Sequence, residues 1–318
     1  MSQPRDHHFL PAFYLDQWAV NDGKLIEYSI KHSKLIAKRV GPASTGFQRD
    51  LYAFPELSPD ESQHVEKVFF DYADRVASQA LQKYLTRDHS PWTAELRSAW
   101  SRFVIGIHLR HPDAIAELRV ASKAAWDREH GPSQAAYEKI RKPDDPPTFE
   151  EYIETHLPLT PIKAFANMMI KVIDNQNLGT HINHMQWGVV DLGRSGIPLL
   201  TSDRPVEIHK LKEKSGFLSI PISPTQLFVA ANERTTLQSI AASDLKKMVK
   251  SVNKFVVSRA RRYVYAPDER QRPFLEKHMS KGMEPLPLFP RASKIGAPDF
   301  VPSQSPFQQP DSISDRES

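Results

Sequence analysis

The order in which helix-like and strand-like hydrophobic patterns follow one another constrains the fold of this chain most. Short segments rich in Leu, Ile and Val lie near the N-terminus, at residues 24–30 and 34–40. Apolar residues then recur every three or four positions through a long central block, which is typical of amphipathic helices. Strand-like segments return near residue 185, and a final helical pattern covers residues 243–265. This order predicts an α+β fold.

We expect the strands to form one mixed or antiparallel sheet, built from the N-terminal and central segments. The central helical block and the long C-terminal helix should pack against it. Segments 24–30 and 34–40 predict a hairpin, and segments 217–222 and 226–231 predict a second strand pair. A loop with glycine at both ends, residues 193–196, predicts a further hairpin between the strands that flank it.

Local signals mark where several helices begin and end. Ser58 to Glu61 combines a serine cap, a proline at the first helical position and a glutamate three residues after the cap. Because Pro112 disfavours helical geometry at His111, one helix should stop there and the next should begin at Pro112. Thr148 opens a capping box, and the polar residues 131–147 before it predict a surface loop that contains a short helix.

The C-terminal end of the chain differs in composition from the rest. After Met283 it is rich in Pro, Ser and Gln. Such a segment cannot bury enough apolar surface to offset the entropy lost on ordering. We therefore predict a single α+β domain over residues 1–283 and a disordered Pro/Ser/Gln-rich tail over residues 284–318.

Composition excludes several classes of protein and site. No apolar run is long enough to form a transmembrane helix, and the N-terminal residues lack the apolar core of a secretory signal. The absence of cysteine excludes disulfides, thiolate nucleophiles and cysteine-based metal sites. Phosphate-loop, dinucleotide-binding, zinc-protease and serine-hydrolase motifs are also absent. These observations predict a cytoplasmic protein without membrane contact, of undetermined oligomeric state.

Charge is mildly positive overall and concentrated in one region. The formal net charge is +4 over 318 residues. Between Lys246 and Lys281, the basic residues far outnumber the acidic ones, which are Asp268, Glu269 and Glu276. Clustered Lys and Arg favour nucleic acid or another anionic ligand as a partner. The alternative is the solvated face of an amphipathic helix followed by a charged loop.

Pairs of histidines three residues apart invite a metal hypothesis. His108 and His111 lie near a helix end, and His181 and His184 precede a strand. On a helix this spacing places two imidazoles on one face, but a metal site needs at least a third ligand. Such pairs also arise by chance in a chain with 13 histidines. A divalent metal cofactor is therefore one alternative, and a site without metal is the other.

Two polar stretches next to apolar runs are more specific candidates for a functional site than these histidine pairs. His7 and His8 directly precede an apolar run, and imidazole suits proton transfer near neutral pH. Ser202, Asp203 and Arg204 end a strand that is expected to be buried. The alternatives are a hydrated terminal stretch anchored by the apolar run, and a turn in which Asp203 accepts hydrogen bonds from nearby backbone amides while Arg204 offsets its charge.

Several motifs together resemble a known family. They are His7-His8-x-x-Pro11-x-Phe13-Tyr14-Leu15, Asp50-Leu51-Tyr52, Arg110-x-Pro112, the strand with Trp187, Thr201-Ser202-Asp203-Arg204-Pro205, Pro221-x-Ser223-Pro224 and Asn253. In this combination the chain resembles the bacterial domain-of-unknown-function family 4238 over about residues 5–267. The resemblance implies a single domain of that family and supplies no activity.

The residues of these motifs are largely polar, whereas residues selected for packing alone would be apolar. We predict four catalytic residues, His7, His8, Asp50 and Asp203. We predict four substrate-binding residues, Arg110, Ser202, Arg204 and Asn253.

Two hypotheses account for this set. The first is a hydrolase of a phosphate ester or nucleic acid, in which an imidazole is general base or metal ligand, the aspartates orient or ligate, and the arginines hold the anion. The second is a non-catalytic binding or regulatory module, in which the same residues form a buried structural network and the basic helix recruits an anionic partner. A His8–Asp203 pair that lines a cleft favours the first hypothesis, and a fully enclosed pair favours the second.

Overall fold

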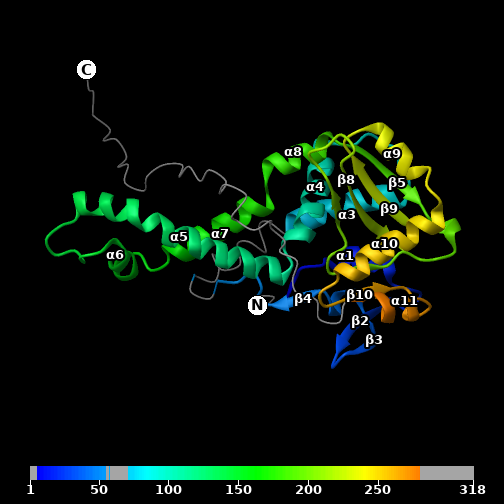
Figure 1. The fold of residues 1–318 in the computed structure, drawn as a ribbon, viewed down its shortest axis with the longest axis horizontal. Coiled ribbons are helices and arrows are strands. Elements are labelled where there is room, and N and C mark those ends of the chain that lie inside the picture. The colour runs from blue at the N-terminus through cyan, green and yellow to red at the C-terminus, as the bar shows by residue number, and fades with distance from the viewer. Residues whose placement is uncertain (1–5, 55–56, 58–70, 280–318) are drawn as a thin grey trace, which may run out of the picture. The chain divides into compact units, whose positions relative to one another are not determined.

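A computed structural model describes residues 6–54, 57 and 71–279 of the protein (Figure 1). Its strands are β1 (Asp6–His8), β2 (Leu25–Lys31), β3 (Lys34–Val40), β4 (Phe47–Arg49), β5 (Gln186–Asp191), β6 (Thr201–Ser202), β7 (Glu207–His209), β8 (Phe217–Ser223), β9 (Gln226–Ala231) and β10 (Val264–Ala266). Its α-helices are α1 (Ala12–Leu15), α3 (Asp71–Leu85), α4 (Ala94–Leu109), α5 (Pro112–Ile140), α6 (Phe149–His156), α7 (Thr160–Ile173), α8 (Gln176–His184), α9 (Arg234–Ala241), α10 (Leu245–Arg259) and α11 (Arg272–His278). The predicted helix start at 58–61 and the predicted tail at 284–318 lie outside the described residues, so the domain boundary stays a prediction.

The α+β prediction is confirmed, and the strands are divided among separate antiparallel sheets. One sheet has the order β3-β2-β10-β6, so the N-terminal hairpin is joined to strands from the centre and the C-terminal part of the chain. A second sheet has the order β5-β9-β8-β7, and β1 pairs with β4 separately. The two predicted hairpins, β2–β3 and β8–β9, are both present.

The second sheet is buried on both faces. Along β9 the side chains alternate between two apolar clusters, because successive strand residues point to opposite faces. Phe228 and Ala230 belong to the cluster formed with α1, α3 and α4. Leu227 and Val229 belong to the cluster around α10. The sheet therefore lies between α3 and α4 on one side and α10 on the other.

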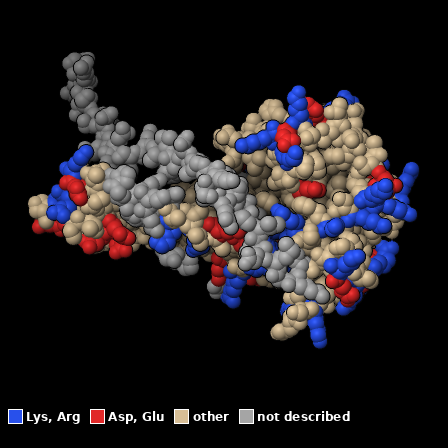
Figure 2. Space-filling view, viewed as in Figure 1, with Lys and Arg blue, Asp and Glu red and all other residues tan. Residues whose placement is uncertain are grey.

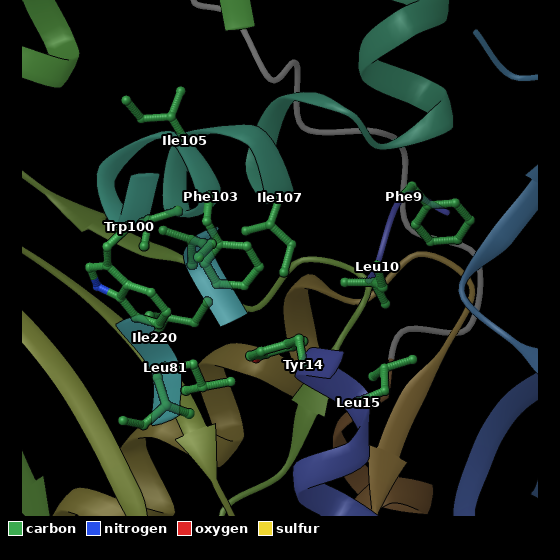
Figure 3. Packing of buried hydrophobic residues seen from close by; sticks show 14 of the residues in the cluster. Phe9, Leu10, Tyr14, Leu15, Leu81, Trp100, Phe103, Ile105, Ile107 and Ile220 are labelled. Atoms are coloured by element: carbon green, nitrogen blue, oxygen red, sulfur yellow. The ribbon is translucent and has the colours of Figure 1, made fainter. Parts of the chain in front are cut away.

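The N-terminal segment is anchored into the first of these clusters. Figure 3 shows the side chains of Tyr14, Phe103 and Ile220 gathered between α1, α4 and β8. The Tyr14 hydroxyl also donates a hydrogen bond to the Pro221 carbonyl at 2.9 Å, and the Trp18 indole donates to the Leu199 carbonyl at 2.8 Å. Because the buried polar atom of each aromatic side chain makes a hydrogen bond, both rings add apolar contact without the cost of an unsatisfied polar group.

The predicted break between α4 and α5 is confirmed at Pro112. His111 is the N-cap of α5, and its ring nitrogen Nδ1 accepts a hydrogen bond from the Asp113 backbone N–H at 3.1 Å. The predicted loop at 131–147 is wrong in its first part, because α5 continues to Ile140. Contact with α6 accounts for the continuation, since the Tyr137 ring lies 5.3 Å from the Tyr152 ring. Figure 1 shows α5 and α7 extending from the sheets toward α6.

One predicted hairpin and one predicted helix are wrong for the same reason, which is that their segments pair with distant parts of the chain. The expected hairpin around 193–196 does not form, because β5 pairs with β9 while β6 pairs with β10 in the other sheet. The expected helix over 243–265 ends at Arg259, and Val264–Ala266 form β10. Among the described residues, no helix is long and apolar enough to cross a membrane.

Candidate functional site

His7 and His8 lie on β1, where the pairing with β4 sets their directions. His7 is buried, and its Nδ1 accepts a hydrogen bond from the Tyr52 backbone N–H at 3.0 Å. Its ring stacks on the Tyr52 ring at 5.5 Å between centroids. Tyr52, in the segment that follows β4, thus contacts both Nδ1 and the ring face of His7.

Arg110 connects this pair of histidines to α3. Its guanidinium donates hydrogen bonds to both carboxylate oxygens of Asp74, at 2.9 and 2.8 Å, and is buried. The Tyr52 hydroxyl donates to the Arg110 carbonyl at 2.9 Å. We call His7, His8, Tyr52, Asp74 and Arg110 the Arg110 cluster.

His8 is the least constrained member of the Arg110 cluster. Burial lowers its pKa, while the Ala43 carbonyl and the nearby Asp6 and Asp74 carboxylates raise it and Arg110 lowers it. Its Nε2 is buried without a hydrogen-bond partner in the described part of the chain. A neutral imidazole whose ring nitrogen has no hydrogen-bond partner is suited to accept a proton.

Asp203 is fully buried at the end of β6 and saturated with hydrogen bonds. Its carboxylate accepts from the backbone N–H groups of Arg261 at 2.9 Å, Arg262 at 2.5 Å and Tyr263 at 3.2 Å. The Nε2 of His111 lies 3.4 Å from Oδ2 of Asp203. Because Nδ1 of His111 already accepts from the start of α5, Nε2 carries the proton that reaches Asp203.

These contacts determine the charge state of Asp203. Burial by itself raises the pKa of its carboxyl group, but the hydrogen bond and charge of His111 and the backbone N–H donors outweigh burial and hold the pKa below its usual value. The carboxylate also redirects the chain after α10, since it binds the backbone that leads into β10. This contact explains why the helix is shorter than its apolar pattern predicts.

Ser202 and Arg204 flank Asp203 and are buried with it. The Ser202 hydroxyl accepts a hydrogen bond from the Arg204 backbone N–H at 3.1 Å. The Arg204 guanidinium reaches Asp113 in the first turn of α5, with Nη2 3.4 Å from Oδ2. We call His111, Asp113, Ser202, Asp203 and Arg204 the Asp203 cluster.

The remaining predicted site residues, Asp50 and Asn253, have contacts elsewhere. Asp50 occupies a turn after β4 with a φ of 54°. Asn253 accepts from the Leu200 backbone N–H at 2.9 Å and donates to the Pro198 carbonyl and the Gln271 side chain. Its amide therefore ties α10 to the segment before β6.

The structure thus gathers the predicted residues other than Asp50 and Asn253 into two adjoining clusters. Arg110 and His111 are consecutive residues that serve different clusters, and the Phe9 ring lies 5.5 Å from the His111 ring between them. Sequence reasoning missed His111 as the partner of Asp203, although its spacing from His108 had drawn attention to it. It also missed Asp74, for which no sequence motif gave a signal. Within the described residues, no group of three or more His, Asp and Glu side chains is placed to hold a metal ion.

The fold and these clusters define an α+β protein whose predicted polar site residues are mostly tied into buried networks. The profile of the family described as "Protein of unknown function (DUF4238)" matches residues 6–270, and the chain belongs to this family. The predicted family membership is confirmed. No curated protein and no solved structure matches the chain.

A pH-dependence test follows from His108, which lies at the C-terminal end of α4. Burial, reinforced by the charges of Arg204 and Arg259, lowers the pKa of His108 to about 4. Since its unfolded pKa is near 6.5, the unfolded chain binds the proton first, and the protein should lose up to about 1.4 kcal/mol per pH unit between these values. Urea unfolding at several pH values should show that His108→Leu removes this slope. The exposed His209→Leu should keep it, and equal slopes in all three proteins would contradict the assignment.

Proposed function

We propose that this protein is a non-catalytic binding module, and that its α10 binds an anionic partner, namely a nucleic acid. Asp203 has no exposed surface, and three backbone donors and His111 use its acceptor capacity. A substrate would have to displace these partners, so the arrangement favours a structural network over a reaction centre.

The single observation that carries the proposal is the lysine face of α10. Lys246, Lys247, Lys250 and Lys254 are exposed, and α10 contains no acidic residue. Figure 2 shows Lys and Arg side chains along the surface over α10. In the part of the chain that the structure describes, no carboxylate pairs with these four lysines. Unpaired lysines along one helix face can neutralise the phosphates of a nucleic acid backbone.

The test is binding to a short DNA duplex as a function of salt concentration. For the double variant Lys250→Gln, Lys254→Gln, we expect the slope of log affinity against log salt to shrink by about 1.8, since each lost phosphate contact accounts for about 0.9. The matched control, Lys212→Gln with Lys214→Gln, removes the same charge from an exposed loop and should leave the slope unchanged. Equal losses in both double variants, or no binding by the native protein, would refute the proposal.

A second candidate function is hydrolysis of a phosphate ester or nucleic acid, and His8 is the observation that favours it. Its buried Nε2 has no hydrogen-bond partner among the described residues, and its lowered pKa keeps the ring neutral at pH 7. In this function His8 is the general base, and Arg110 and Arg204 hold the anionic substrate.

Phosphodiester cleavage, measured with and without Mg²⁺ or Mn²⁺, tests this second function. His8→Ala should reduce the rate by at least about 100-fold, as expected when a general base is removed. His209→Ala changes an exposed histidine and should leave the rate unaltered. An unchanged rate in His8→Ala, or no cleavage by the native protein under any of these conditions, would rule the hydrolase out.

A further inference from the structure

The sheet β3-β2-β10-β6 has an open edge at β3. Among the described residues β3 pairs only with β2, and Figure 1 shows it as the outermost strand of this sheet. The Leu35 carbonyl accepts a hydrogen bond from Nη2 of Arg272 on α11, at 3.5 Å, so it is directed away from β2. Because the backbone groups of an antiparallel strand point alternately toward and away from its neighbour, those of Ala37 and Arg39 also point away from β2. This edge can therefore pair with a further strand.

A cavity lies beside this edge, between the β2–β3 hairpin and α11. Its volume is about 420 Å³. Ile30 and Leu35, which are cross-strand neighbours, line it from the hairpin, and Leu275 and Met279 line it from the C-terminal side. On a strand added to β3, the side chain opposite Leu35 would lie about 5 Å from it, on the same face of the sheet. The aliphatic lining of the cavity favours an aliphatic side chain at that position.

The opposite face of β3 is cationic. Lys34 and Lys38 lie on it, both are exposed, and neither has an ion pair in the described part of the chain. The cross-strand neighbour of Lys34 is Lys31, and that of Lys38 is Glu27, which is buried and accepts a hydrogen bond from the Thr45 hydroxyl. Because β3 contains no acidic residue, pairing with the same strand of a second copy would add like charges. Acidic side chains on an added strand would neutralise these lysines instead.

We propose that β3 binds an extended acidic peptide segment of a partner protein, which adds a strand to the sheet. Alternate acidic side chains of the peptide lie beside Lys34 and Lys38, and an aliphatic side chain on its other face enters the cavity. In strand addition, main-chain hydrogen bonds supply affinity and pockets for alternate side chains supply specificity. A nucleic acid would neutralise the lysines but would use neither the backbone edge nor the aliphatic cavity. The proposal does not depend on nucleic-acid binding by α10.

Fluorescence anisotropy of the full-length protein with a short labelled peptide, in which Glu alternates with Val and Leu, tests the proposal. The native protein should bind this peptide saturably and should not bind one with Lys in place of Glu. Lys34→Glu with Lys38→Glu should weaken binding of the Glu peptide at least about fivefold and create binding of the Lys peptide, because the cross-strand charge pairs are reversed. The matched control, Lys212→Glu with Lys214→Glu, reverses the same charge in an exposed loop and should bind like the native protein.

Methylation of the peptide backbone distinguishes strand addition from simple attraction between charges. Only alternate amides of an added strand face β3, so N-methylation of one alternate set should abolish binding, and N-methylation of the other set should preserve it. Ala37→Pro removes an outward N–H group, which an edge strand tolerates, and should also weaken binding. The circular dichroism spectrum of this variant should match that of the native protein.

Three results would overturn the proposal. They are no saturable binding of the Glu peptide by the native protein, equal effects of the two methylation patterns, and unchanged binding after the reversal of Lys34 and Lys38. Displacement of the peptide by a short DNA duplex would assign this edge to nucleic acid instead. The variant Lys250→Gln, Lys254→Gln should still bind the peptide, which separates failure of this site from failure of the DNA-binding proposal.

Discussion

Replacing Asp203 with alanine is expected to lower the free energy of unfolding by about 3–5 kcal/mol, as when one partner of a buried ionic network is removed. The substitution leaves the backbone N–H groups of Arg261, Arg262 and Tyr263 and the Nε2 of His111 without their shared acceptor. Urea unfolding followed by circular dichroism measures the change. Asp203→Asn should lose less stability, because an amide oxygen still accepts hydrogen bonds.

The control for Asp203 is an aspartate whose ion pair is exposed. Asp22 lies 2.7 Å from Arg39 at the surface, and Asp22→Ala should lower the stability far less than Asp203→Ala does, because solvent screens an exposed ion pair. The pKa of Asp203 is lowered in the folded protein, so its contribution is complete above the unfolded value near 3.8 and is lost as the pH falls through the folded value. An Asp203→Ala variant as stable as Asp22→Ala would show that the network does not hold the fold together.

Asp74→Ala is expected to lower the free energy of unfolding by about 3 kcal/mol, the lower end of the range for breaking a buried ion pair. The Arg110 guanidinium is only 2% exposed, and it loses both hydrogen bonds that it donates to Asp74. A buried cation deprived of its main partner is more unfavourable than an apolar side chain in the same place.

The double variant Asp74→Ala, Arg110→Met distinguishes this cause from a simple loss of packing. Because methionine carries no charge, the double variant should recover most of the stability lost in Asp74→Ala. A double-mutant cycle, measured by urea unfolding, gives the coupling energy between the two side chains. Additive losses would contradict the interpretation of the Arg110 cluster as a buried ion-pair network.

The elements that sequence predicts well are those whose signals are local. Pro112 marks the start of α5, and Thr148 caps α6 by accepting from the Glu151 N–H. The sequence predicts too long a helix at α10, because Val264 and Tyr265 continue its apolar pattern. The helix ends earlier because the backbone after it donates hydrogen bonds to Asp203, about sixty positions earlier in the chain. No local signal encodes a contact at that separation.

Contacts between distant residues also limit how much of the candidate site the sequence predicts. Ser202, Asp203 and Arg204 were identified by their position at a strand end, and they do lie together. Their relation to His111 follows from the packing of α4 against the N-terminal segment, which spacing in the sequence does not reveal. The predicted functional roles stay predictions, and the hydrogen bonds of Asp203 match the alternative in which its carboxylate binds backbone amides.

The position of β10 between β2 and β6 has a consequence for how the protein is made. The N-terminal hairpin leaves the ribosome more than two hundred residues before the strand that completes its sheet. Throughout that interval β2 presents an open edge, which can pair with other nascent chains. β2 is therefore synthesised early but gains its second neighbour late, and a chain that terminates before Val264 keeps this edge of β2 unpaired.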